Sequence, residues 1–181
     1  MATGAALAPG RNYAASNYRF FKFYVYLFAV TLGIQTGHML EHVTQVIQKF
    51  VLHVTPAHGL IGRLDLEQIH FGFNSAYLLM FFPLFLGWFC YRAEIAELTP
   101  RWKLLAGIFL ITFIVQIYHQ AEHTAKLVQY LNTHMQGTQG ILGAHFDLVI
   151  MHFIINLLVY LPMLVVFFGG GLHRKLLPRS R

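Results

Sequence analysis

The sequence predicts an all-α membrane protein in which four transmembrane helices form a bundle. Of its 181 residues, 56% are hydrophobic and 11% are charged, and the apolar residues gather in four stretches of about the ~20 residues that a helix needs to cross a bilayer core. In addition, the second half of the chain repeats the first. We therefore expect a tandem duplication of a two-helix hairpin, with a pseudo-twofold axis along the membrane normal.

Polar and basic segments divide the chain into five parts. Residues 1–17 lack the apolar core of a cleavable signal, so we expect them to form a tail and the first apolar stretch to remain as a membrane span. The predicted parts are a cytoplasmic N-terminal tail 1–17, a first helical-hairpin repeat 18–92, a linker 93–102, a second helical-hairpin repeat 103–168 and a basic C-terminal tail 169–181.

Local signals predict where the helices begin and end. Thr99 and Pro100 are expected to start the third helix, as a cap followed by proline in the first turn. Asp65 and Asp147 are expected to cap the second and fourth helices, and Gly169–Gly171 should end the last one. The Phe-rich stretches are expected to face lipid.

The repeat becomes visible when the sequence is shifted by 81 positions, or by 82 after one inserted residue. Eight of the eleven histidines then fall on another histidine. The matched pairs include Lys22/Lys103, Phe28/Phe109, Thr31/Thr112, Gln35/Gln116, His38/His119, Glu41/Glu122, His42/His123, Gln48/Gln129, His53/His134, Gly59/Gly140, Asp65/Asp147, His70/His152 and Asn74/Asn156. Because each copy contains two spans, both copies must enter the membrane in the same orientation.

The basic residues predict the topology. Ten of the thirteen Lys and Arg residues precede the first span, lie between the second and third, or follow the fourth, whereas Lys49, Arg63 and Lys126 lie elsewhere. Since Lys and Arg concentrate on the cytoplasmic side, we expect both termini and the linker to be cytoplasmic. Anionic lipid accounts for this charge, so membrane lipids are the expected partners and nucleic acid is not.

The motif His-x-x-Glu-His occurs once in each repeat. Positions i, i+3 and i+4 of a helix share one face, so His38, Glu41 and His42 should project together. Lipid cannot satisfy such polar side chains, and they must face the protein interior. Glu41 lies 19 residues beyond Lys22, which is roughly 28 Å along a helix at about 1.5 Å per residue. The motif should therefore lie near the extracytoplasmic boundary of the membrane.

These residues predict a metal site at the interface of the two repeats. Imidazole with carboxylate suits iron, copper or zinc, whereas calcium and magnesium prefer oxygen ligands. Iron and copper are the leading candidates for the metal, and zinc is the next. Glu41 and Glu122 are also the candidate catalytic bases. The predicted ligands are His38, Glu41, His42, His70, His119, Glu122, His123 and His152.

Several functions fit this inventory. The leading hypothesis is a dinuclear iron or copper oxidoreductase that acts on an apolar or lipid-soluble small molecule near the outer leaflet. The alternatives are a heme-binding electron-transfer subunit, a zinc-dependent membrane hydrolase, and a non-catalytic metal carrier or accessory subunit that serves a membrane protein partner.

Overall fold

The computed structural model describes residues 10–62 and 66–176, with side chains from Tyr18 onwards. Asp65, predicted to cap the second helix, lies outside the described residues. The elements are α1 (Gly10–Phe50), α2 (Glu67–Cys90), α3 (Arg92–Leu98), α4 (Trp102–Thr133), α5 (Leu148–Gly169) and the 3-10 helix η1 (Leu172–Lys175).

Four of these helices, α1, α2, α4 and α5, are long and apolar enough to cross a membrane. This agrees with the predicted number of spans and is the pattern of an integral membrane protein. The α1 helix begins inside the predicted N-terminal tail, and the short α3 helix occupies the predicted linker. Outward-facing side chains such as Phe23, Leu79 and Ile111 are apolar and exposed, as a lipid-facing surface requires.

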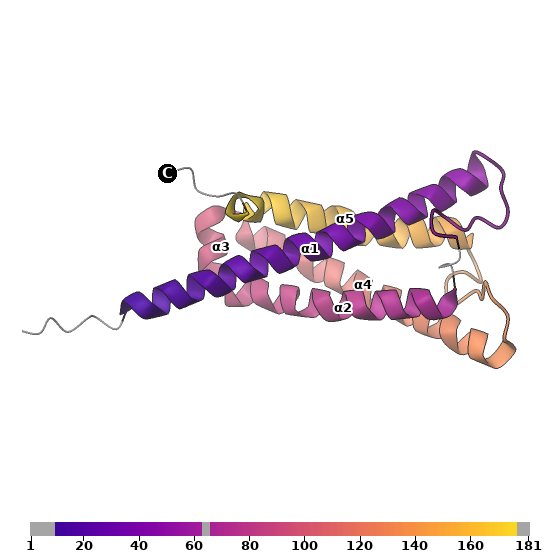
Figure 1. Cartoon of the computed structure of the whole chain (residues 1–181), viewed down its shortest axis with the longest axis horizontal. Coiled ribbons are helices and arrows are strands. Elements are labelled where there is room, and N and C mark those ends of the chain that lie inside the picture. The colour runs from indigo at the N-terminus through magenta and orange to yellow at the C-terminus, as the bar shows by residue number, and fades with distance from the viewer. Residues whose placement is uncertain (1–9, 63–65, 177–181) are drawn as a thin grey trace, which may run out of the picture.

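The four long helices run along the longest axis of the molecule (Figure 1). The α1–α2 and α4–α5 connections lie together at one end, called the loop end below, and α3 and η1 lie at the other. The most extensive contacts join α2 to α4, α1 to α5, and α4 to α5, while α1 touches its own hairpin partner α2 less. The α1 helix therefore packs chiefly on the second half of the chain.

An aromatic core fills the end away from the loops. The ring of Phe109 lies 5.5 Å from Phe28, 5.1 Å from Phe81 and 5.8 Å from Trp88, measured between ring centroids. All four side chains are fully buried. The prediction that the Phe-rich stretches face lipid is therefore wrong for these phenylalanines, because helices that are apolar on every side do not reveal which side is inward.

Polarity increases along the interior toward the loop end. Beyond the aromatic core lie two buried threonines, Thr31 and Thr112, whose hydroxyls donate to backbone carbonyls of their own helices. Next comes Gln35, whose amide donates to Asn156 Oδ1 at 3.1 Å and links α1 to α5. The histidines follow one turn further on. This gradient sets the candidate site close to the loop end and leaves the other half of the interior dry.

The helix ends test the local signals. Asp147 caps α5 as predicted, accepting hydrogen bonds from two backbone N–H groups of the first turn at 3.0 and 3.2 Å. Gly171 adopts a φ of +71° just after α5, as expected for a helix-ending glycine. The prediction for the third helix is wrong: α4 begins at Trp102, and Thr99 instead terminates α3.

Candidate functional site

Six of the predicted site residues meet in the interior near the loop end. We call this group the histidine cluster; α1 contributes two of its members, α2 one, α4 two and α5 one. The members are His38, His42, His70, His119, His123 and His152. Neighbouring rings are separated by 4.6 to 6.3 Å between centroids. The cluster joins both halves of the chain, since His42 approaches His152 at 6.1 Å and His70 approaches His123 at 5.7 Å.

Two pairs within the cluster come from successive turns of one helix. The Nε2 atoms of His38 and His42 are 3.2 Å apart, and those of His119 and His123 are 3.1 Å apart. The i, i+4 spacing explains this approach, because it stacks the two side chains on one face. Two nitrogens so close require a proton or a cation between them.

The ring of His152 is held with one nitrogen turned toward the interior. Its Nδ1 lies 2.8 Å from the carbonyl oxygen of Leu148, and because a carbonyl can only accept, Nδ1 carries the proton. In the neutral ring the lone pair then resides on Nε2, which is buried and has no hydrogen-bond partner among the described residues. His70 makes the matching contact at 3.4 Å. A backbone partner on one nitrogen is the usual arrangement of a histidine whose other nitrogen binds metal.

A cavity of about 30 Å³, called the central cavity below, lies between the four long helices and is lined by four of the six histidines; it has room for one or two water molecules. Its walls are polar. The lining residues are His42, Gln45, Glu67, His70, His123, Lys126 and His152. The cavity thus touches all four long helices and receives side chains from both repeats.

Glu67 and Lys126 are site residues that the sequence reasoning missed. Their side chains form an ion pair at 3.1 Å and are only 7% and 8% exposed. The sequence does carry a signal: Glu67 lies three residues before His70, and Lys126 lies three residues after His123, so each shares a helix face with a cluster histidine. This signal is hard to recognise in the sequence, because the two halves of the chain carry different residues at these positions.

A polar pocket of about 410 Å³ leads from the loop end to the cluster. It shares Gln45, Glu67, Lys126 and His152 with the central cavity, and its outer wall is formed by the segments that follow α1 and α4. The four shared residues place this pocket directly beside the central cavity, on the side of the loop end.

The two motif glutamates lie outside the central cavity and bind backbone amides instead. Glu41 accepts hydrogen bonds from the N–H groups of Leu60 and Ile61 at 2.9 and 3.3 Å. Glu122 does the same with Ile141 and Leu142, at 2.9 and 3.2 Å. In the structure both carboxylates anchor the loops, and their roles as metal ligands and bases stay predictions.

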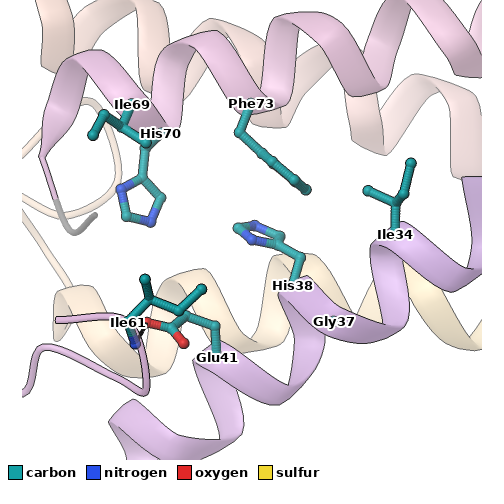
Figure 2. Close-up of a pocket in the computed structure, with 8 residues that line it drawn as sticks. All are labelled: Ile34, Gly37, His38, Glu41, Ile61, Ile69, His70 and Phe73. Atoms are coloured by element: carbon teal, nitrogen blue, oxygen red, sulfur yellow. Dashed lines mark hydrogen bonds between the residues drawn. The ribbon is translucent and has the colours of Figure 1, made fainter. Parts of the chain in front are cut away.

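A second, apolar pocket of about 270 Å³ reaches the cluster from between α1 and α2. Figure 2 shows His38 and Phe73 next to each other in its wall, with His70 and Glu41 nearer the segment that carries Ile61. The rings of His38 and Phe73 stack, with centroids 4.3 Å apart and planes 29° from parallel. Two cluster histidines and Glu41 thus form part of the wall of a pocket that is apolar elsewhere.

Within residues 10–62 and 66–176, no group of three or more His, Cys, Asp or Glu side chains is arranged so that it could hold a metal ion as it stands. The closest approaches within the cluster are the two Nε2···Nε2 contacts, each between two histidines of one helix.

Comparison of the chain with protein-family models, curated proteins and solved structures finds no significant match, so any function has to be argued from the histidine cluster and its surroundings.

Proposed function

We propose that this chain is an integral membrane metalloprotein whose histidine cluster binds a transition metal. The observation that carries the proposal is the convergence of six imidazoles from four helices, with neighbouring ring centroids 4.6 to 6.3 Å apart. An imidazole bound at about 2.0–2.1 Å has its centre about 3.2 Å from the ion, so two rings on one ion have centres about 4.5–6.4 Å apart. The measured separations fall in this range.

The two Nε2···Nε2 contacts support the same assignment. Nitrogens that bind one ion at about 2.0–2.1 Å, with an angle of about 90–110° between them, are about 2.9–3.4 Å apart. The pairs His38/His42 and His119/His123 have 3.2 and 3.1 Å. An N–H···N hydrogen bond produces a similar distance, but it involves only two rings and does not account for the approach of His70 and His152 to both pairs.

We further propose that the chain is a tandem duplication with a pseudo-twofold axis through the cluster. Contacts that recur 81 residues apart support it. Gln48 and Gln129 each clamp one glycine, Gly59 and Gly140, by accepting from its N–H at 2.8 Å and donating to its carbonyl at 2.9 Å. The two motif glutamates likewise bind matching loop amides. This symmetry favours two ions per chain, one on each histidine pair.

In this proposal His70 and His152 supply the further ligands. Each approaches both histidine pairs, and a turn of either imidazole would bring a third nitrogen to an ion. The shell is then rich in imidazole, which favours copper or iron, with zinc as an alternative. A cavity of about 30 Å³ is far smaller than a heme, so the proposal is metal bound directly by side chains.

The activity we propose is that of an oxidoreductase acting on an apolar molecule, with the loop end extracytoplasmic and both termini cytoplasmic. Copper or iron bound by histidine would supply electron transfer. The chain itself contributes two separate approaches to the cluster: the polar pocket bordered by Glu67 and Lys126, which admits water and protons, and the apolar pocket beside His38. An enzyme that transfers electrons between a lipid-soluble substrate and a water-soluble one needs both approaches.

A non-catalytic metal carrier is the second candidate. It is favoured by the polar pocket of about 410 Å³, through which a hydrated ion can travel from the loop end to the cluster. The rate at which bound metal is lost distinguishes the two candidate functions. Metal that a chelator removes within minutes indicates a carrier, whereas an enzyme should retain its metal.

The decisive experiment is elemental analysis of protein purified without chelators. We expect one to two equivalents of copper or iron, and nitrogen ligands at about 2.0–2.1 Å by X-ray absorption. Less than about a tenth of an equivalent of iron, copper, zinc and manganese combined would refute the proposal, and a Soret absorption band would identify heme in its place.

Substitutions in the two pairs test whether the repeats share one centre. If they do, His42→Ala should lower the metal content nearly as far as His42→Ala combined with His123→Ala, because members of one network are strongly non-additive. The control is His145→Ala, which removes an exposed histidine at the same end of the molecule and should leave the metal content unchanged. If each single variant keeps half of the metal and the double variant loses all of it, the sites are independent.

A further inference from the structure

The two repeats carry pockets in corresponding places, but the two pockets differ in whether cluster histidines line them. The pocket between α1 and α2 has a counterpart of about 570 Å³ lined by α4, α5 and the segment between them. Five pairs of positions related by the 81- or 82-residue shift contribute to the walls of the two pockets. These pairs are Ile34/Val115, Gly37/Tyr118, Ile61/Leu142, Ile69/Met151 and Phe73/Ile155.

The first pocket reaches the cluster, whereas the second does not. His38 and His70 line the first pocket and are half-buried. Their counterparts His119 and His152 do not line the second pocket and are 0% and 8% exposed. The histidine cluster is therefore accessible from the apolar side on one face, that of α1 and α2.

Of the matched lining pairs, Gly37 and Tyr118 differ most in size. Tyr118 lines the second pocket, and its hydroxyl lies 3.4 Å from Glu122 Oε2, so the side chain reaches along the wall toward the motif glutamate. The matching position in the first repeat is Gly37, where even a Cβ atom would meet nothing within 4 Å. The missing side chain leaves His38 open to the pocket.

The geometry points to a binding site for a lipid-soluble molecule with one polar head group in the pocket between α1 and α2. The pocket walls that surround the head are apolar except for His38, His70 and Glu41. Its rim includes Ile61 and Ile69, whose side chains are exposed, so an apolar tail can leave the pocket over an apolar surface. A hydroxyl or carbonyl at the head would meet an imidazole nitrogen, and Phe73, stacked on His38, would pack against the first carbons of the tail.

This inference rests on the proposed metal site, since it brings the head group of the substrate to two of the proposed ligands. The volume of about 270 Å³ is slightly below the roughly 300–1,000 Å³ of sites that enclose a whole drug-sized ligand. The pocket therefore holds the head and a short part of the tail, which is the portion that has to reach the cluster.

Photolabelling in liposomes tests the site. Two probes are used, each a chain of about sixteen carbons with a diazirine about two carbons from one end; that end carries a hydroxyl in one probe and a methyl group in the other. We expect the hydroxyl probe to label the Ile69–Phe73 segment about 2- to 10-fold more than the methyl probe, the effect of about one hydrogen bond. The second pocket should show no preference between the probes.

Gly37→Tyr copies the second repeat into the first and should abolish the preference. The matched control is Gly107→Tyr, which places the same side chain at an exposed glycine of α4 where a Cβ also meets nothing within 4 Å; it should leave the preference intact. Equal labelling by the two probes, or a preference that survives Gly37→Tyr, overturns the inference.

Metal content measured on the same samples separates this inference from the proposed function. Gly37→Tyr should retain the metal of the unaltered protein. Metal without a probe preference refutes the pocket alone, while a preference that Gly37→Tyr abolishes in protein without metal supports the pocket and refutes the metal site.

Discussion

The buried ion pair of Glu67 and Lys126 predicts that one substitution costs more stability than two. Lys126→Met leaves the Glu67 carboxylate without its cation, and Glu67→Gln leaves the ammonium without its anion. The combined variant contains no charge at either position. The free energy of unfolding of the three variants therefore tests whether the pair is a coupled, buried unit.

The expected magnitude follows from the distance and the burial. At 3.1 Å and an effective dielectric constant of about 20, the attraction is about 5 kcal/mol, much of which offsets the cost of removing both charges from water. Breaking a buried pair by removing one partner costs about 3–5 kcal/mol. Because the polar pocket brings water to Glu67 and Lys126, we expect about 3 kcal/mol for each single variant, and a smaller loss for the combined one.

The assay is unfolding by SDS titration in mixed micelles, performed on metal-free protein so that bound metal does not contribute. The control is Lys49→Met, which removes the cation of the exposed pair with Asp147 and should cost less than about 1 kcal/mol. If both single variants at the buried pair also cost less than that, and the combined loss equals their sum, the charges are hydrated and independent and the reasoning is wrong.

Three further predictions concern the loops and the topology. Gly59 has a φ of +78°, and a Cβ atom there would overlap Glu41 Oε1, so Gly59→Ala should lower the free energy of unfolding by more than the about 1–2 kcal/mol of backbone strain alone without changing metal content; unaltered thermal unfolding would contradict this. Partial burial alone would raise the pKa of Asp147, but the hydrogen bond and charge of Lys49 and the helix amides lower it below its usual range. The stabilisation that ionised Asp147 provides is therefore complete above the usual Asp pKa and is lost as the pH falls through the lowered pKa. Asp147→Asn should remove this contribution to the acid dependence of the melting temperature, while the asparagine still caps α5. In a cysteine-free background, Ala144→Cys should react with an impermeant thiol reagent from outside and Glu97→Cys from the cytoplasm; the reverse pattern would invert the proposed orientation.

The number of spans and the six histidines could be predicted from the sequence. Hydrophobic stretches long enough to cross a membrane indicate that the helices are surrounded by lipid, and this indication does not depend on how the helices pack against one another. In the predicted duplication both copies have the same orientation, so matched residues are expected at one depth. In the structure His38 and His119 belong to one cluster, and its depth in the membrane stays a prediction.

The motif glutamates show where that reasoning ends. The spacing assigns Glu41 and His42 to one broad polar face, but consecutive residues are about 100° apart around a helix of 3.6 residues per turn. They cannot both point to the centre. The rotation of α1 against its neighbours turns His42 inward and Glu41 toward the amides of the returning loop, and that rotation is fixed by packing.

The tertiary structure alone decided the pairing of Glu67 with Lys126 and the unequal access to the two repeats. Both depend on residues where the copies differ: Lys126 corresponds to Gln45, and Tyr118 to Gly37. The sequence by itself determined the membrane spans, the repeat and the histidine inventory, since these follow from composition and spacing along one chain. Which side chains meet across helices depends on helix rotation and contact, and those are set by the packing of all four helices together.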